Sequence, residues 1–382
     1  MLKNIVLISL LIATMFASAS VQRLSEEAKI SVLTCGPSNE LYATFGHTAI
    51  HLWDTNKHLN LVFNYGTFDF NTPNFYVKFT QGRLPYMLSI TSFEDFIYAY
   101  RQEGRWVYEQ ELRLTPEEKE KMYDLLLENY LPANRYYAYD FFMDNCATRI
   151  RDLISNSLVD RSLFKKSLSD TNTTFRELIK PYMHSMQWWR LGIDLALGMR
   201  CDKPVDHEQY MFLPNELMAQ LDTATIEGER MVAKKVLIAK ETKLPQTKSV
   251  PPLLITSLLC IIVILLTVWE YKKKTYFKWL DIILFSLASV LSLLIAYLWF
   301  FSNHYTTKYN LNLIWAHPLF IYLLLRLRKS KDILIHISYG LIVLCILGFW
   351  FLPQTFNPAV FPVLLLLALR IINLIKQKRK LV

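Results

Sequence analysis

Residues 139–156 read YDFFMDNCATRIRDLISN, and they place Cys146 directly before a helical pattern. After the cysteine, Ile150, Leu153 and Ile154 recur at the spacing of one helix face, with charged residues between them. This spacing predicts an amphipathic helix whose apolar side packs against the rest of its domain. The start of the helix therefore fixes where Cys146 lies in the fold.

Cys146 is expected in the first turn of this helix, because Asp144 or Asn145 is a suitable N-cap. Unpaired backbone N–H groups and the positive end of the helix dipole favour an anion there. The thiol should then ionise more easily than that of a free cysteine, as in cysteine nucleophiles. The alternative interpretation is a small buried core residue that happens to begin a helix.

Composition divides the chain into a globular part and a membrane part. Of its 382 residues 52% are hydrophobic, and the apolar residues concentrate in 1–19 and 253–382. Much of the net charge of +9 lies in short basic runs between apolar segments, which indicates membrane topology rather than nucleic-acid binding. The five cysteines show no paired spacing, so neither a disulfide framework nor a zinc ribbon is expected, although Cys35 and Cys201 could pair.

The N-terminus resembles a secretory signal peptide. Lys3 is followed by a short apolar core, Ile5–Phe16, and by the small residues Ala17-Ser18-Ala19. The core is too short to cross a bilayer comfortably, so cleavage near Ala19 and export of the mature domain are predicted. Residues 20–245 then form an exported α+β domain, and 246–252 a linker.

The last part of the chain predicts an all-α membrane domain in residues 253–382. Five apolar segments approach the length needed to cross the hydrocarbon core, and they are Leu253–Trp269, Leu280–Phe301, Leu311–Leu325, Ile333–Leu352 and Ala359–Ile375. Basic residues follow the first, third and fifth segments, so those loops are expected in the cytoplasm and the N-terminal domain outside. His317 and His336 are weak candidates for a functional role at membrane depth, whereas Arg370 is expected to reach the cytoplasmic interface by snorkelling.

Several elements of the exported domain have recognisable patterns. Thr115-Pro116-Glu117-Glu118 combines an N-cap, a first-turn proline and a capping-box glutamate, which predicts a helix to about Tyr130. Alternation predicts strands over 27–34, 45–53 and 59–65, the last two as a hairpin. We further expect a helix over 186–199, a short helix after Pro214, and a hairpin within 224–242.

His47 is the candidate base for Cys146. It lies in the strand FGHTAIHLW, next to Gly46, which permits a bend or a close backbone approach. The alternative interpretation is that His47 is a surface residue, or a core histidine whose hydrogen bonds are made within the domain. Paired with Cys146, it provides what nucleophilic acyl transfer needs, because the imidazole accepts the thiol proton and the thiolate attacks a carbonyl. The backbone N–H of Cys146 can help to stabilise the oxyanion.

A third group usually orients the imidazole, and Asn64, on the neighbouring strand, is the leading candidate. Asp69, Asp140 and His51 follow it. Arginines are interspersed among the aromatic residues of 68–105. This pattern fits two interpretations, a groove for acyl chains beside an anionic headgroup or a core with a charged rim. The candidate substrate-binding residues are Tyr65, Asp69, Arg105, Tyr139, Asp140, Asn145 and Arg149.

The order of histidine first and cysteine about 100 residues later resembles circularly permuted papain-like (NlpC/P60-like) families. These include the lecithin:retinol acyltransferase group and the phospholipid-dependent N-acyltransferases. The stretches LTCGPSNELYATFGHTAIHLWD, FNYGTFDF, YYAYDFFMDNCATRIRDL and MFLPNEL, followed by five apolar segments, are similar to the Lnb-type lipoprotein N-acyltransferases.

The resemblance implies an exported catalytic domain in the periplasm, joined to a five-helix domain in the bacterial inner membrane. It implies that an acyl chain passes from a membrane phospholipid, through a Cys146 thioester, to the α-amine of a lipoprotein's N-terminal diacylglyceryl-cysteine. His47 would be the base and Cys146 the nucleophile, while the family likeness leaves the third member open. The partners are then the phospholipid donor, the diacylated lipoprotein and the bilayer, and no cofactor, metal or nucleotide motif is present in the sequence.

Two other functions compete with this interpretation. Related papain-like folds act as cell-wall amidases or peptidases, although one anchor would suffice for such an enzyme. A non-catalytic membrane sensor or scaffold, in which His47 and Cys146 are structural, is the third. Substitution of His47 and Cys146 separates the scaffold from both enzymes, because a scaffold should keep working.

Overall fold

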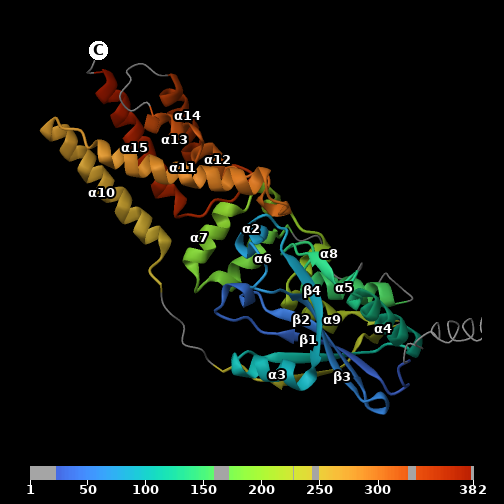
Figure 1. Cartoon of the computed structure of the whole chain (residues 1–382). Coiled ribbons are helices and arrows are strands. Elements are labelled where there is room, and N and C mark those ends of the chain that lie inside the picture. Colours follow the sequence, from blue (N-terminus) through green and yellow to red (C-terminus); the bar gives the residue numbers. More distant parts are fainter. Residues whose placement is uncertain (1–22, 159–171, 227, 243–248, 326–332, 380–382) are drawn as a thin grey trace, which may run out of the picture.

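The structure is a computed structural model that describes residues 23–158, 172–226, 228–242, 249–325 and 333–379. The predicted signal peptide, residues 1–19, and part of the predicted linker lie outside the described residues. Figure 1 shows an N-terminal domain of strands and helices beside a C-terminal bundle of helices, with α7 (Gln187–Ala196) near their junction.

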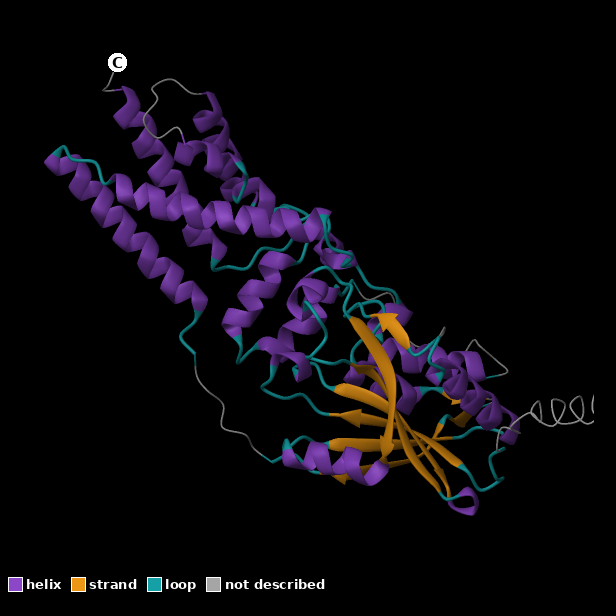
Figure 2. Ribbon diagram, in the orientation of Figure 1, coloured by secondary structure: helices purple, strands orange, loops and turns teal. Residues whose placement is uncertain are grey.

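The N-terminal domain is built on a seven-stranded sheet in which every neighbouring pair is antiparallel (Figure 2). The strand order is β6-β4-β3-β2-β1-β5-β9. The strands are β1 (Lys29–Cys35), β2 (His47–Asp54), β3 (Leu59–Thr67), β4 (Pro85–Ser92), β5 (Val107–Leu112), β6 (Tyr136–Ala138) and β9 (Val232–Ala239). The three predicted strands are confirmed, and β2 and β3 form the expected hairpin.

The prediction of a hairpin within residues 224–242 is confirmed for residues 225–230 and wrong for the strand that follows them. The short strands β7 (Thr225–Ile226) and β8 (Glu229–Arg230) pair with each other. The longer β9 instead joins the main sheet beside β5. The partner of β9 was not predictable, because β5 lies more than a hundred residues earlier and alternation specifies a strand without its neighbour.

Helices cover both faces of the sheet. The helices α4 (Pro116–Tyr130), α5 (Cys146–Ser157) and α9 (Pro214–Thr223) pack on one face, where Ile50 and Phe63 of the sheet meet Ile150 of α5 in a buried core. On the other face, α3 (Phe93–Gln102) covers Val62. The predicted capping box before α4 is present, since Thr115 and Glu118 satisfy each other's backbone N–H groups.

The remaining elements of the N-terminal domain are short. The helices are α2 (Phe75–Thr80), α6 (Phe175–Ile179) and α8 (His207–Tyr210), with the 3₁₀ turns η1 (Leu41–Ala43), η2 (Thr55–Lys57), η3 (Lys180–Met183) and η4 (Met199–Asp202). The predicted helix over 186–199 is shorter than expected, because α7 ends at Ala196 and a separate 3₁₀ turn follows Gly198.

The C-terminal domain contains three helices that are long and apolar enough to cross a membrane. These are α10 (Pro252–Lys273), α11 (Lys278–Phe300) and α15 (Val360–Arg379). The other two predicted spans are shorter in the described residues, as Asn312–Leu325 and Ile333–Gly348. The first of these is divided into α12 (Asn312–Trp315) and α13 (Leu319–Leu325), because Pro318 cannot continue a helix. Among the described residues, three of the five predicted spans are therefore long enough to cross a membrane, and two are shorter than predicted.

The segment that follows α11 is docked on the N-terminal domain. Backbone–backbone hydrogen bonds hold it there: Asn303 N donates to Gln81 O (2.8 Å), Gly198 N to Thr306 O (2.8 Å) and Met199 N to Tyr309 O (3.1 Å). The guanidinium of Arg200 also lies over the rings of Tyr305 and Tyr309. Residues 302–310, predicted to lie outside the membrane, therefore face the exported domain.

Arg370 does not reach the cytoplasmic interface, so that expectation was wrong. Its side chain is fully buried and binds two acidic residues of neighbouring helices, Glu270 of α10 and Asp281 of α11. Arg370 Nε donates to Asp281 Oδ1 at 2.6 Å. The charge of Arg370 is therefore balanced inside the bundle by two carboxylates, rather than by water at the interface.

Candidate active site

Asn145 is the N-cap of α5, so Cys146 is the first residue of the helix, as predicted. The Asn145 Oδ1 atom accepts hydrogen bonds from the backbone N–H groups of Ala147 (2.8 Å) and Thr148 (2.9 Å). Its Nδ2 donates to the carbonyls of Phe141 and Phe212. The polar atoms of the Asn145 side chain thus hold the helix start in place, and its contact with substrate stays a prediction.

His47 is the first residue of β2. The pairing between β2 and β3 starts only at Ile50 and Phe63, so His47 lies outside the paired part of the strand. Gly46 takes a φ of +83°, and a Cβ there would lie 2.8 Å from the carbonyl oxygen of Cys35. The close approach expected from the sequence is therefore present. Because the two strands separate here, the His47 imidazole has room beside the Cys146 thiol, close enough for each group to shift the pKa of the other.

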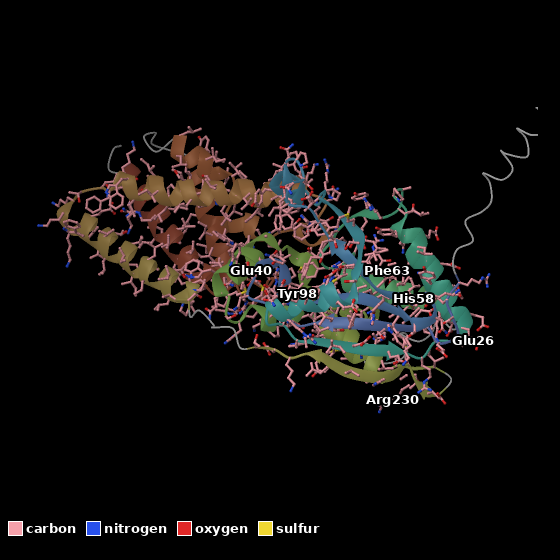
Figure 3. All side chains as sticks on the ribbon, turned by 60° about the horizontal axis from the view of Figure 1, so that its bottom comes forward. Glu26, Glu40, His58, Phe63, Tyr98 and Arg230 are labelled. Atoms are coloured by element: carbon pink, nitrogen blue, oxygen red, sulfur yellow. The ribbon has the colours of Figure 1, made fainter. Side chains whose placement is uncertain are left out.

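The site lies at the end of the sheet that faces the helical bundle. In Figure 3, Glu40 of the loop before β2 lies toward the bundle, whereas His58 in the turn after β2 lies at the opposite end. His47 begins β2 and is therefore at the bundle-facing end. A substrate held in the membrane would approach the domain from this side.

Asn64 contacts the His47 imidazole. Its Oδ1 atom lies 2.5 Å from His47 Nε2, so the leading candidate for the third group is the one in contact. When the amide oxygen accepts, Nε2 carries the proton and Nδ1 is left for the thiol. The other candidates are elsewhere: His51 bonds Glu109 and Asn60, while Asp69 and Asp140 accept bonds from nearby backbone N–H groups.

The electrostatics of the pair favour charge separation. Burial of the Cys146 thiol raises its pKa, but the adjacent His47 charge, the hydrogen bond from His47 and the backbone N–H of Thr48 outweigh it and lower the pKa to about 7. Burial lowers the pKa of His47, but the Cys146 charge and the hydrogen bonds to Cys146 and Asn64 outweigh it and raise that pKa. The pair can therefore exist as thiolate and imidazolium near neutral pH.

Tyr137 also lies near Cys146, and it was not among the predicted site residues. Its hydroxyl and the Cys146 Cβ each lie 3.9 Å from the point that a Cβ on Gly66 would occupy, and Gly66 has a φ of +88° in a bulge of β3. The hydroxyl is buried and has no hydrogen-bond partner among the described residues. Tyr136 is exposed and Tyr137 is half-buried, as alternation in a strand requires, but β6 has only three residues and gives too short a pattern to be recognised from the sequence.

Three other predicted substrate contacts have structural partners. The Tyr65 hydroxyl accepts a bond from Asn129 in the core behind the site. Arg105 is buried, donates from Nε to the carbonyl of Gly36 and pairs through Nη1 with Glu103. Arg149 forms a two-point ion pair with Asp144, and its guanidinium lies 4.0 Å from the centre of the Tyr137 ring.

Tyr139 and Asp140 connect the site to the bundle. The Tyr139 ring stacks on Tyr86 at 4.3 Å and lies against Gly66. Asp140 Oδ1 accepts bonds from the Phe142 and Met143 N–H groups, and its Oδ2 accepts from Tyr305 N at 3.3 Å. Asp140 thus ties the loop before Cys146 to the segment after α11.

The aromatic middle section is neither a closed core nor an isolated surface. Its rings follow one another from Tyr86 through Phe68 and Phe75 to Phe79 of α2. Tyr76 of α2 is 77% exposed. This helix adjoins the bundle, since Phe79 O lies 2.9 Å from His304 Nε2. The rings therefore form a continuous apolar path between the bundle and Tyr139 beside Cys146.

Two family models match the chain. The model described as the Lnb N-terminal periplasmic domain matches residues 19–181, and the model described as the Lnb transmembrane domain matches residues 245–381. No curated protein matched the chain in the comparison, and neither did any solved structure. The first match contains His47, Asn64, Tyr137 and Cys146, and the second contains α10 to α15.

Proposed function

The chain belongs to the Lnb family, which makes it an inner-membrane protein with a periplasmic domain, and we propose that it is a lipoprotein N-acyltransferase with a Cys146 nucleophile. Family membership indicates an enzyme that modifies lipoproteins in the membrane. The specific reaction is our proposal, in which an acyl chain passes from a phospholipid to the α-amine of a diacylated lipoprotein. The observation that carries it is the array of the buried Cys146 and the half-buried His47 and Asn64 at the bundle-facing end of the sheet.

In the first half-reaction the Cys146 thiolate attacks the carbonyl carbon of a phospholipid ester. The oxyanion that forms is positioned for the backbone N–H of Cys146 and the free hydroxyl of Tyr137. The ester C–O bond breaks, and the leaving alkoxide takes its proton from the His47 imidazolium. The products are a lysophospholipid and an acyl thioester on Cys146.

In the second half-reaction the neutral α-amine of the lipoprotein attacks the thioester carbonyl. His47 accepts the proton that the nitrogen loses, and the C–S bond breaks to return the thiolate. The product is an amide. Because the first product leaves before the second substrate reacts, the mechanism predicts ping-pong kinetics.

The setting suits substrates that stay in the bilayer. Docking of residues 302–310 on the N-terminal domain holds the site over the membrane helices. Donor, acceptor and enzyme are then confined to one surface, which raises their effective concentration. The aromatic path from α2 to Tyr139 gives an acyl chain an apolar surface along which to reach Cys146.

The elements around Cys146 also bear on the fold of the N-terminal domain, and the apolar helices bear on the membrane topology. A cysteine at a helix start that packs on an antiparallel sheet, with its histidine on a neighbouring strand, supports a circularly permuted papain-like fold. We also propose that the apolar stretches Asn312–Leu325 and Ile333–Gly348 cross the bilayer with α10, α11 and α15. Five crossings place residues 301–311 and 349–359 on the side of the catalytic domain and the C-terminus in the cytoplasm.

The test is mass spectrometry of a lipoprotein's N-terminal peptide from cells that lack their own N-acylation activity. Cells with the parent protein should add an acyl mass to the α-amine, whereas Cys146→Ser and His47→Ala should add none. Cys201→Ser is the matched control, because Cys201 is buried in a different core cluster and should leave acylation intact. No added mass from a well-expressed parent protein would reject the transferase and favour cell-wall substrates. An equal mass from Cys146→Ser would remove Cys146 from the mechanism.

A further inference from the structure

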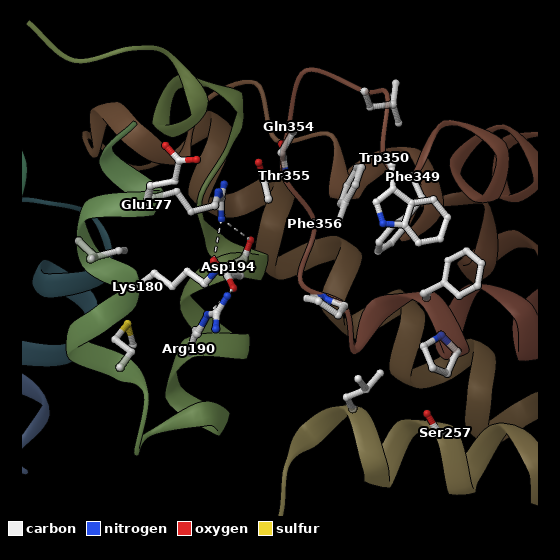
Figure 4. A pocket seen from close by; sticks show the side chains of 18 residues that line it. Glu177, Lys180, Arg190, Asp194, Ser257, Phe349, Trp350, Gln354, Thr355 and Phe356 are labelled. Atoms are coloured by element: carbon white, nitrogen blue, oxygen red, sulfur yellow. Dashed lines mark hydrogen bonds and ion pairs between the residues drawn. The ribbon is translucent and has the colours of Figure 1, made fainter. Parts of the chain in front are cut away.

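A cavity of about 630 Å³ lies where the N-terminal domain meets the membrane helices (Figure 4). One wall comes from α6, η3 and α7 of the N-terminal domain. The opposite wall comes from the start of α10 and from the segment between α14 (Ile333–Gly348) and α15. None of Cys146, His47, Asn64 or Tyr137 lines it, so the proposed reaction leaves this cavity without a role.

The wall from the N-terminal domain is polar and rigid. Arg176 donates to Asp194 (3.0 Å) and to Asp202 (2.9 Å), and its remaining N–H groups face the carbonyls of residues 197 and 198. Asp194 also accepts a bond from Asn357 Nδ2 at 2.8 Å, across the cavity boundary. Arg176 is therefore saturated, and its network fixes the wall without offering a donor to a ligand.

Two further cations on this wall keep donors available. Arg190 approaches Asp194 only through Nε, at 3.5 Å, and that carboxylate is already shared with Arg176 and Asn357. Lys180 is exposed, and its ammonium has no ion pair or hydrogen bond within the described part of the chain. Figure 4 shows Lys180 and Arg190 extending from the same side of the cavity. Together they form a site of positive charge suited to a phosphate.

The opposite wall is apolar and aromatic. Phe349 and Phe356 lie with their ring centres 5.5 Å apart, and Trp350 contacts Phe361 at 5.1 Å. Trp350 is 71% exposed, and Leu253 at the start of α10 also lines the cavity. Exposed aromatic surface of this kind at the end of membrane helices is typical of contact with lipid.

The cavity is at the level of the membrane surface. The α10 helix begins at Pro252, α14 ends at Gly348 and α15 begins at Val360, so all three meet the cavity at their outer ends. On α7, Trp188 and Trp189 are both exposed, as interfacial tryptophans are. The charged wall then lies at headgroup height, and the aromatic wall leads toward the hydrocarbon.

We propose that this cavity binds an anionic phospholipid of the periplasmic leaflet. Its phosphate lies between Lys180 and Arg190, and one acyl chain follows the wall formed by Phe349, Trp350 and Phe356. Two cations face the headgroup, and both carboxylates of the lining are engaged, Asp194 with Arg176 and Glu177 with the backbone N–H of Thr174. A net negative headgroup is therefore favoured over a zwitterionic one. This lipid contacts both domains and so stabilises their junction.

The test measures lipid binding to the full-length protein in mild detergent by native mass spectrometry. The probes are phosphatidylglycerol, phosphatidylcholine with the same acyl chains, and soluble glycerol phosphate. The parent protein should bind phosphatidylglycerol about tenfold more tightly than the Lys180→Gln, Arg190→Gln double variant does, and more tightly than it binds phosphatidylcholine. Lys203→Gln, an exposed lysine outside the cavity, and Cys146→Ser should bind as the parent does.

A second measurement is independent of the variants' folding. Phosphatidylglycerol with a diazirine on its acyl chain should label peptides within residues 349–362 of the parent protein upon irradiation. Parental affinity in a folded double variant, or labelling that leaves residues 349–362 unmodified, would overturn the proposal. Glycerol phosphate bound as tightly as the lipid would show a site for soluble phosphate instead, and equal affinity for both lipids would remove the role of charge. Because Cys146→Ser is part of the series, binding and catalysis can fail separately.

Discussion

Asn64 Oδ1 lies 2.5 Å from His47 Nε2, although the pairing between their two strands stops before either residue. The separation of β2 from β3 at this end makes room for the imidazole, and the amide fixes which ring nitrogen faces Cys146. The same strand pair holds a second histidine–asparagine contact, His51 Nε2 to Asn60 Oδ1 at 2.8 Å, but His51 is also bonded to Glu109. Of these two histidines, His47 is the one that lies beside Cys146, the proposed nucleophile.

Replacement of Asn64 should therefore slow acyl transfer. Asn64→Ala removes the acceptor for Nε2–H, so the ring samples other orientations and kcat should fall by about a hundredfold. Asn64→Asp keeps an acceptor and should retain more activity than Asn64→Ala. The measurement is the rate of acyl transfer from phospholipid to a diacylated lipopeptide by the purified protein.

Asn60→Ala is the matched control, because it removes the same contact from His51 and should leave kcat near the parental value. Equal losses in Asn64→Ala and Asn60→Ala would mean that both variants act through the stability of the hairpin and would remove Asn64 from the site.

Alkylation of Cys146 should follow the ionisation of its thiol. The pKa of Cys146 is lowered to about 7, whereas burial raises the pKa of Cys201 to about 12 despite the nearby Arg176. The thiolate fraction grows as pH rises through the pKa, so the rate of modification by iodoacetamide should increase from pH 6 to 8 and then level off, with an inflection near 7. Peptide mapping identifies the modified cysteine.

His47→Ala should move that inflection to higher pH. Without the imidazolium, burial of the thiol dominates and disfavours the thiolate, so Cys146 should react slowly at pH 7 and gain reactivity only in alkaline solution. An inflection that stays near 7 in His47→Ala would show that the helix start and Thr48, rather than His47, lower the pKa.

The position of Cys146 at the start of a helix could be predicted from sequence because its signals are local. An N-cap, a cysteine and apolar residues at helical spacing lie within a single stretch, and α5 begins at Cys146 as expected. His47 and Asn64 were also accessible, since alternation defines β2 and β3 and a short turn makes them neighbours. The pairing of His47 with Cys146, in contrast, depended on chemical reasoning and on a family resemblance.

Tyr137 and Arg370 show where such reasoning ended. The strand β6 has only three residues, so its alternation was too short to distinguish it from a link, and its place beside β4 is a tertiary contact. Arg370 was placed by its distance from the helix end, which ignores Glu270 and Asp281 on other helices. In both cases the deciding partner is remote in sequence, and periodicity carries no information about it.

Tyr137→Phe should slow acylation while leaving the ionisation of Cys146 unchanged. The hydroxyl is buried beside the nucleophile without a partner among the described residues, and loss of one oxyanion donor costs about 100- to 1,000-fold in kcat. The measurement is the rate of thioester formation from phospholipid, followed by intact-protein mass spectrometry, with the alkylation profile as the second readout.

Tyr136→Phe is the control, since that neighbouring ring is exposed and its hydroxyl binds Arg135 at the surface. Parental acylation by Tyr137→Phe would leave the backbone N–H of Cys146 as the oxyanion donor without help from Tyr137. A shifted alkylation profile would instead assign Tyr137 to the environment of the thiolate.

The buried ion cluster of the membrane domain should be a major determinant of its stability. Arg370 binds Glu270 and Asp281, and Asn373 and Tyr276 donate to the same carboxylates. Arg370→Leu leaves two carboxylates buried without their cation, so the free energy of unfolding should fall by about 3–5 kcal/mol. Thermal unfolding in detergent measures the loss, with Lys272→Leu, an exposed cation on α10, as the control.

Adding Glu270→Gln and Asp281→Asn to Arg370→Leu removes the uncompensated charge and should restore part of the stability. A loss no larger than that of Lys272→Leu would contradict the expectation, because it would mean that the carboxylates find water or protons once Arg370 is gone.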